Sequence, residues 1–262
     1  MFTALDLAQD NYASRLDQAI SIVRSGRDDP AAYFSIAWSW RILGECRLLA
    51  DANVDAFVDY LGRAAQARLA FLRKVGDGLK AEPQFVCASK NMPFTSALAV
   101  GDMATAREIA QLSATSHYPT VEYEDDFLFF HFLHRLTVAP EDTPGQQVTL
   151  ARWKDVLEGG ESGALAACRA LSTRSAEDFT PAFASFIAKR QTGLAEYREN
   201  PAFNEQLFAA EGHVYVEALA LLRFAELRGL PTEREYPLVP AMARVPVQTE
   251  KSADGRWLSP VS

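Results

Sequence analysis

The sequence is poor in cysteine and contains no long apolar run. It has three cysteines in 262 residues, Cys46, Cys87 and Cys168, and no two of them form a Cys-x-x-Cys pair. A sparse, odd-numbered set is neither a disulfide framework nor a zinc or redox motif. No stretch approaches the roughly 18 apolar residues of a membrane span, and residues 1–10 lack the basic start and apolar run of a signal peptide. These absences predict a cytoplasmic protein without disulfides and without membrane contact.

Basic side chains are also in short supply. Lys and Arg total 26 against 34 Asp and Glu, which gives a net charge of -8. A nucleic-acid-binding protein needs a basic face that neutralises phosphates, so this balance argues against a nucleic-acid partner. An acidic surface favours association with a basic partner, although an acidic surface that is simply well solvated has the same composition.

Glycine and proline are scarce before residue 229, whereas alanine and leucine are abundant, a balance that favours helix. Apolar residues recur at three- and four-residue steps, which is the pattern of helices with one buried face. Asp29-Pro30 and Asn200-Pro201 combine a capping side chain with proline at the first helical position. The sequence therefore predicts an all-α single domain over residues 1–230, with roughly ten helices packed as antiparallel α-hairpins. We expect these helices at 3–25, 30–50, 53–75, 93–100, 103–112, 122–139, 147–157, 164–171, 175–198 and 200–228.

The last segment, 231–262, has a different character. Its five prolines rule out a long helix there. Val239, Val245 and Trp257 could lay an extended arm across the helices, and a mostly disordered terminus is the alternative. The segment is therefore predicted as an extended, proline-containing C-terminal tail.

The sequence lacks the common catalytic and metal-binding motifs. No Gly-x-Ser-x-Gly elbow, P-loop or Gly-rich dinucleotide turn occurs. His131 and His134 lie three residues apart on one expected helix, with Glu124 two turns before His131, but no obvious fourth metal ligand accompanies them. His213 and Glu217 have the spacing of an acid–base pair, which is also that of an ordinary contact on a helix surface. We therefore expect no catalytic residue, no metal and no cofactor.

The most unusual local feature is the acidic run 122–126, Glu-Tyr-Glu-Asp-Asp, which precedes Phe-Leu-Phe-Phe. Acids in the first turn of a helix stabilise it through the helix dipole, but one or two acids suffice. Four carboxylates around a tyrosine also suit contact with Lys or Arg of a partner, and tyrosine is common in binding hot spots. The candidate partner-binding residues are therefore Tyr118, Glu122, Tyr123, Glu124, Asp125 and Asp126.

Residues 97–136 carry a family resemblance. They read Ala-Leu-Ala-Val-Gly-Asp-Met-Ala-Thr-Ala-Arg-Glu-Ile-Ala, then a loop, then Tyr-Glu-Asp-Asp-Phe-Leu-Phe-Phe-His-Phe-Leu-His. This helical hairpin with its acidic-aromatic helix resembles the immunity protein 49 family of bacterial polymorphic-toxin systems, and the order of the N-terminal helices is similar over residues 1–225. The resemblance implies a cytosolic immunity protein, or antitoxin, that neutralises a secreted toxin from a neighbouring gene by direct binding. It identifies neither the toxin's activity nor any binding residue.

Other functions are compatible with the same sequence. A helical-bundle enzyme or ligand-binding protein would have a pocket near His131 and His134, and a helical-repeat adaptor would bind several unrelated proteins. Many toxins delivered between bacteria attack nucleic acids through basic clefts, with which an acidic inhibitor would associate quickly. We therefore expect a cognate toxin with a basic surface as the partner, and a nuclease is one candidate for that toxin. The sequence does not indicate the oligomeric state.

Overall fold

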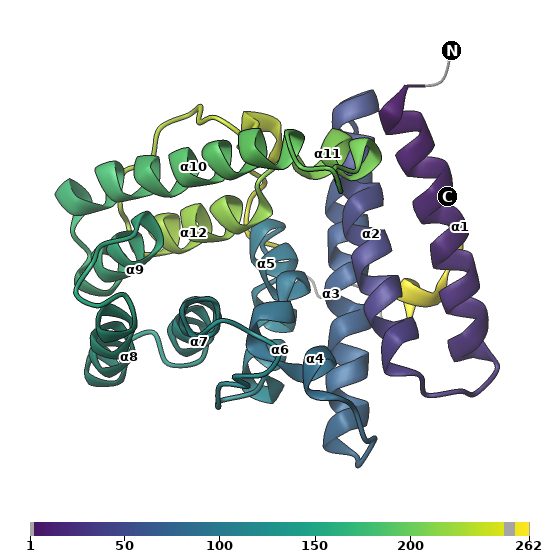
Figure 1. The fold of residues 1–262 in the computed structure, drawn as a ribbon, viewed down its shortest axis with the longest axis horizontal. Helices are drawn as coiled ribbons and strands as arrows, with labels where there is room; N and C mark the ends of the chain where they lie inside the picture. Colours follow the sequence, from purple (N-terminus) through teal and green to yellow (C-terminus); the bar gives the residue numbers. More distant parts are fainter. Residues whose placement is uncertain (1–2, 249–254, 262) are drawn as a thin grey trace.

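Helices make up most of the chain, which the computed structural model describes over residues 3–248 and 255–261 (Figure 1). The residues in these two ranges form no strand, and one isolated bridge joins Tyr236 to Val239. The prediction of an all-α fold is therefore confirmed. None of the described helices combines the length and the hydropathy that crossing a bilayer requires.

Three long helices stand side by side at one end of the molecule (Figure 1). Each begins at a capping side chain, Thr3, Asp29 or Asn53, that accepts a hydrogen bond from a backbone amide of the first turn. Short connections make neighbouring helices antiparallel, and the rings of Trp40 and Tyr60 lie 4.9 Å apart in the core between the second and third. The helices are α1 (Ala4–Arg24), α2 (Pro30–Asp51) and α3 (Val54–Gly76).

Short helices connect this end to the rest of the molecule. They are α4 (Pro83–Val86), the 3-10 helix η1 (Ala88–Lys90), α5 (Met92–Ala99) and α6 (Met103–Leu112). The α5–α6 hairpin is the predicted one, with Gly101 at φ +77° in its turn and Asp102 capping α6. A Cβ at Gly101 would collide with the backbone at Pro246 and Val247, so the C-terminal segment passes directly over the turn. Helix α5 packs against both α3 and α12 (Val216–Leu227).

The other end of the molecule contains α7 (Glu124–Val138), α8 (Thr143–Val156), α9 (Gly163–Thr173) and α10 (Ala176–Arg198), with α12 packed against α9 and α10 (Figure 1). Gly163, the first residue of α9, lies so close to α10 that a Cβ there would overlap the backbone at Phe186. This close approach fixes α10 against α9 and thereby positions the side chains that α10 directs toward the middle of the molecule.

Residues 200–228 do not form the single long helix that the apolar pattern predicted. They form α11 (Glu205–Glu211) and α12 (Val216–Leu227), with a break at 212–215. The Tyr215 N–H donates to the Leu238 carbonyl oxygen at 2.7 Å, so the C-terminal segment supplies the bond that a continuous helix would have made. Ala210 and Val216 are buried on the two sides of the break, and the apolar spacing therefore continues across it.

The described parts of the C-terminal segment lie against the helices. Val239 and Ala243 are buried, and the Trp257 carbonyl oxygen accepts a hydrogen bond from Trp40 Nε1 at 2.8 Å. Two single 3-10 turns occur in this segment, η2 (Ala241–Ala243) and η3 (Arg256–Leu258). Since Trp40 is itself fully buried, the end of the chain helps to complete the core around α2.

Candidate functional site

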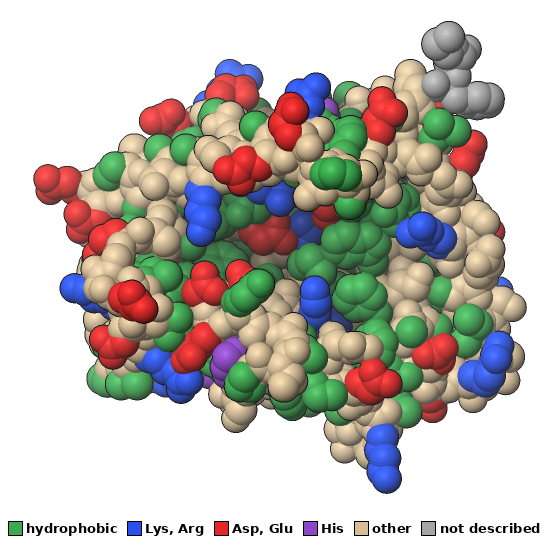
Figure 2. Space-filling view, in the orientation of Figure 1, with side chains coloured by type: hydrophobic (Ala, Val, Ile, Leu, Met, Phe, Trp, Pro, Cys, Tyr) green, Lys and Arg blue, Asp and Glu red, His purple; other side chains and the backbone are tan. Residues whose placement is uncertain are grey.

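A cleft of about 540 Å³ opens where α2, α7, α10, α11 and α12 meet, and we call it the central cleft. Figure 2 shows this hollow near the middle of the molecular face, with acidic and basic side chains among apolar ones. Its aromatic lining consists of Trp38, Phe129, Phe130, Trp153, Phe186 and Tyr215. Its charged lining consists of Arg41, Asp125, Asp126, Lys189, Arg190, Glu211 and Glu217. A concave site of this size with mixed charged and aromatic walls is typical of a binding site.

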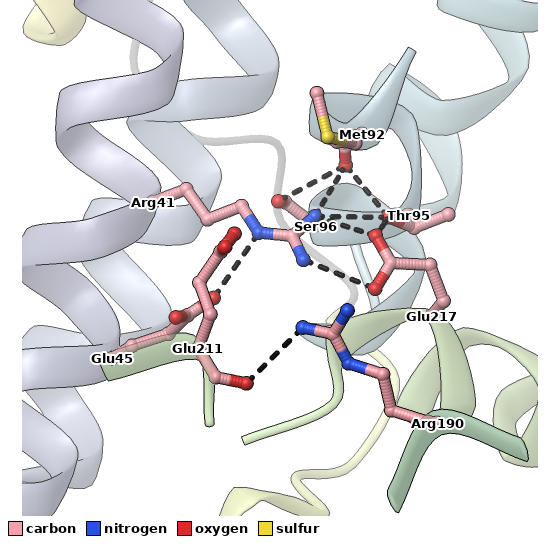
Figure 3. Close-up of polar contacts among 8 residues, drawn as sticks. All are labelled: Arg41, Glu45, Met92, Thr95, Ser96, Arg190, Glu211 and Glu217. Atoms are coloured by element: carbon pink, nitrogen blue, oxygen red, sulfur yellow. Dashed lines mark hydrogen bonds and ion pairs between the residues drawn. The ribbon is translucent and has the colours of Figure 1, made fainter. Parts of the chain in front are cut away.

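Arg41 of α2 joins the charged groups at the base of the central cleft (Figure 3). It is 4% exposed, and its Nη1 and Nη2 donate to the two carboxylate oxygens of Glu217 at 2.8 and 3.1 Å. Its Nε donates to Oε1 of Glu45 at 3.1 Å. Burial alone would raise the pKa of Glu217, but the charge and hydrogen bonds of Arg41 hold that pKa below its usual value. Glu217 is therefore a carboxylate anion held by a two-pronged ion pair.

Two further glutamates lie beside Arg41, and their carboxylates have fewer hydrogen-bond donors than that of Glu217. Glu45 is fully buried, and its Oε2 accepts no hydrogen bond from any described residue. Glu211 of α11 is half-buried in the cleft wall, and its carboxylate likewise has no hydrogen-bond donor in the part of the chain that the structure describes. Burial raises the pKa of Glu45 against the pull of Arg41, and nearby Glu211 raises it further. Burial also raises the pKa of Glu211, against Arg41 and with a contribution from Glu217.

Helix α10 forms a cationic wall of the central cleft with Lys189 and Arg190. The Arg190 guanidinium lies 5.3 Å from the ring centroid of Tyr215, and its Nη2 donates to the Glu211 backbone oxygen at 3.4 Å. Across the cleft, α2 contributes Trp38, whose ring stacks on a neighbouring phenylalanine of the same helix. The walls can therefore hold a charged group both by ion pairing and by contact with aromatic faces.

The six predicted partner-binding residues divide into two groups. Glu122 accepts hydrogen bonds from the backbone N–H groups of Ser89, at 2.9 Å, and Tyr118, at 3.1 Å, so it closes the loop before α7. Glu124 accepts from Arg152 Nε at 2.6 Å, which ties α7 to α8. These two carboxylates and the Tyr118 backbone are therefore engaged within the protein.

The other predicted residues face outward or into the central cleft. Tyr123 is 79% exposed, the largest exposure among the big apolar side chains described. Asp125 and Asp126, in the first turn of α7, both line the cleft. Asp126 remains exposed at the cleft wall, and partial desolvation together with the neighbouring Asp125 carboxylate raises its pKa. The structure thus brings two of the predicted acids to the same site as Arg41 and Glu211.

The two histidines of α7 do not form a metal site with Glu124. His134 is buried, and its Nε2 lies 2.8 Å from Nδ2 of Asn91, a geometry that suits a neutral ring accepting a hydrogen bond. Burial, with the charges of His131 and Arg68, lowers the pKa of His134 to about 3. Among the residues described, no three His, Cys, Asp or Glu side chains converge as metal ligands. Both rings border a separate pocket of about 360 Å³.

Sequence reasoning missed Arg41, Glu45 and Glu211. The signal for the first two was a pair of opposite charges four residues apart among the apolar residues in the middle of α2. The helix contact that the spacing of His213 and Glu217 indicated does not form, because His213 lies in the break at 212–215 and only Glu217 belongs to α12. His213 is exposed, whereas Glu217 is directed to Arg41.

The chain was also compared with known proteins. No protein-family model, no curated protein and no solved structure matches it. The resemblance to the immunity protein 49 family therefore rests on the sequence motifs alone, and a function must be argued from the central cleft.

Proposed function

We propose that this protein is an immunity protein that neutralises a secreted bacterial toxin by direct binding, with the central cleft as part of the contact surface. The observation that carries the proposal is the position of Asp125 and Asp126. They lie in the cleft wall, in the motif that resembles the immunity protein family, and their side chains face a site that already contains undercompensated carboxyls.

The charges of the central cleft favour a basic partner. Five carboxyls lie in or directly beneath it, against three cationic side chains. They are Asp125, Asp126, Glu45, Glu211 and Glu217, against Arg41, Lys189 and Arg190. The whole chain adds a net charge of -8. An acidic concave surface accelerates association with a basic partner and discriminates against acidic ones.

The test is to reverse the charge of Asp125 and Asp126 together to lysine and to measure binding to the product of the neighbouring gene over a salt series. Because charges at a rim mainly affect the association rate, we expect slower association with a weaker salt dependence. The loss of two acids from the first turn of α7 should cost about 1 kcal/mol of stability.

The matched control is the double change Asp10→Lys and Asp17→Lys on the exposed face of α1, which alters the net charge equally but lies outside the central cleft. It should leave the association rate much closer to that of the wild type. Equal effects of the two double variants would place the contact elsewhere. Failure of the wild-type protein to bind the neighbouring gene's product would overturn the proposed function.

A second candidate function is an acid–base enzyme, with the central cleft as its active site instead of the pocket at His131 and His134. The observation that favours it is that Glu211 and Glu217 line the same cleft, where their surroundings shift the two pKa values in opposite directions. Titration of toxin with the protein separates the two functions. A binder abolishes toxin activity at a fixed stoichiometry, whereas an enzyme that modifies the toxin does so in substoichiometric amounts.

A further inference from the structure

The base of the central cleft contains more carboxyls than guanidiniums. Glu45 from α2, Glu211 from α11 and Glu217 from α12 surround Arg41, and Arg190 from α10 approaches from the other side (Figure 3). Three carboxyls therefore face two guanidiniums in a site that is partly shielded from water. Such an excess of negative charge is costly unless a cation or a proton compensates it.

Resting on the proposed function, we infer that the central cleft accepts one arginine side chain of the protein partner, whose guanidinium binds the Glu211 carboxylate beside Glu45. The geometry leaves these acceptors free. Arg41 uses both oxygens of Glu217 and one oxygen of Glu45. Glu45 Oε2, which is buried beneath the cleft, and the Glu211 carboxylate, which lines the cleft, take no hydrogen bond from the described residues.

The shape and lining of the cleft favour arginine over lysine. A guanidinium is planar and presents five donors, so it can bind several carboxylate oxygens and stack on an aromatic face at the same time. Trp38, which is partly exposed, lines the same cleft as Glu211 and offers such a face. An ammonium group is a compact point charge that is more strongly hydrated, and it gains less from these walls.

The cationic wall limits how much positive charge can enter. Lys189 and Arg190 of α10 line the same cleft. Their positive charges would repel a partner segment with several basic side chains, whereas the carboxyls can still accept one. Asp125 and Asp126 of α7 can attract the incoming side chain before it reaches Glu211. The site is therefore suited to a single arginine that projects from a folded partner.

Binding of a cation should be coupled to loss of a proton. Glu45 and Glu211 face Arg41 of α2, Glu217 of α12 and Arg190 of α10, and the balance of these charges with burial raises both pKa values. A guanidinium beside them favours their ionised forms, so its affinity should increase with pH through the range in which they titrate. A purely structural role for Glu211 predicts no such dependence.

The test uses N-acetyl-arginine amide as probe, with N-acetyl-citrulline amide as its uncharged analogue and N-acetyl-lysine amide as the alternative cation. Binding is followed through the indole N–H signal of Trp38 in NMR spectra at pH 5.5 and 7.5. We expect saturable binding of the arginine probe, stronger at pH 7.5, and at least tenfold weaker binding of the other two. Glu211→Gln should weaken the arginine probe about tenfold, and Glu211→Asp, which keeps the charge, should weaken it less.

Glu196→Gln is the matched control, because it removes an exposed carboxylate on α10 that lies outside the cleft lining, and it should bind the probe like the wild type. Equal binding of arginine and citrulline, or no effect of Glu211→Gln in a protein with an unchanged helical spectrum, would overturn the inference. If the toxin binds but the arginine probe does not, the inference fails and the proposed function stands. If the arginine probe binds but the neighbouring gene's product does not, the proposed function fails and the arginine site itself stands.

Discussion

Replacing Arg41 by methionine should strongly destabilise the protein. Methionine has a similar length but cannot donate the three hydrogen bonds that Arg41 makes to Glu45 and Glu217. Removing one partner of a buried ion pair leaves an uncompensated charge and typically costs about 3–5 kcal/mol. Because a change of 1 kcal/mol shifts the Tm of a protein this large by roughly 2–4 °C, we expect a fall of roughly 6–20 °C.

The assay is thermal and urea unfolding followed by circular dichroism at 222 nm, with Arg174→Met as the control. Arg174 pairs with Glu141 at 2.6 Å on an exposed surface, where such an ion pair contributes only about 0–1 kcal/mol. The two variants lose the same charge and gain the same side chain, so the difference between them measures the effect of burial. A loss of stability in Arg41→Met that is no larger than in Arg174→Met would refute the assignment of Arg41 as the centre of a buried network.

The double variant Arg41→Met, Glu217→Gln identifies the source of the loss. If the cost arises from the unpaired Glu217 carboxylate, neutralising it should recover about 1–2 kcal/mol relative to Arg41→Met alone. Additive losses in the double variant would show that the two residues contribute independently.

Two further predictions concern Gly163 and His134. Gly163→Ala should lower stability by about 1–3 kcal/mol, because its Cβ would overlap the α10 backbone. Gly193→Ala, in an open helical position of α10, should be neutral or slightly stabilising. Chemical unfolding of the two variants measures the difference. His134 should remain neutral from pH 7 to about pH 4, because burial lowers its pKa to about 3, and NMR titration of its ring protons measures this. Since the pKa of His134 in the folded state lies below the unfolded value of 6.5, the residue contributes stability above pH 6.5 that is lost as pH falls toward 3. Protonation of the His134 ring near pH 6.5 in the folded protein would contradict its burial.

The helices were predictable because their signals are local. Caps such as Asp29 and Asp102 lie within three residues of the amides that they bind, and the apolar periodicity of α1 to α3 depends on neighbours along the same helix. The break at 212–215 was not predictable in this way, since its decisive hydrogen bond comes from Leu238. The apolar periodicity continues through residues 212–215, but the Tyr215 N–H binds the distant Leu238 carbonyl oxygen and the helix is interrupted there.

In the candidate site, too, local features were predictable from the sequence and long-range contacts were not. Asp125 and Asp126 were identified from the composition of one short run, and the structure brings both to the central cleft. Arg41 and Glu217 are separated by 176 positions in the chain, and nothing local to either residue indicates the other. The acidic run also contained Glu122, which serves to close a loop, because composition alone does not distinguish a carboxylate that binds the protein's own backbone from one that faces solvent.

The chain also contains buried arginines that differ from Arg41 in what they bind. Arg68 donates to the Phe85 carbonyl oxygen near the end of a short helix. Arg223 donates to the Leu98 and Ala99 carbonyl oxygens at the end of α5 and pairs with one carboxylate, that of Glu226. Arg41 instead binds two carboxylates, those of Glu45 and Glu217, and it does so at the base of the central cleft. A helical core has no folding requirement for such a cluster, since apolar side chains of similar volume are often at least as stable. Glu211, in the wall of the central cleft, is the member of this cluster that a partner can reach, and the proposed role in binding accounts for that opening, whereas a role in folding alone does not.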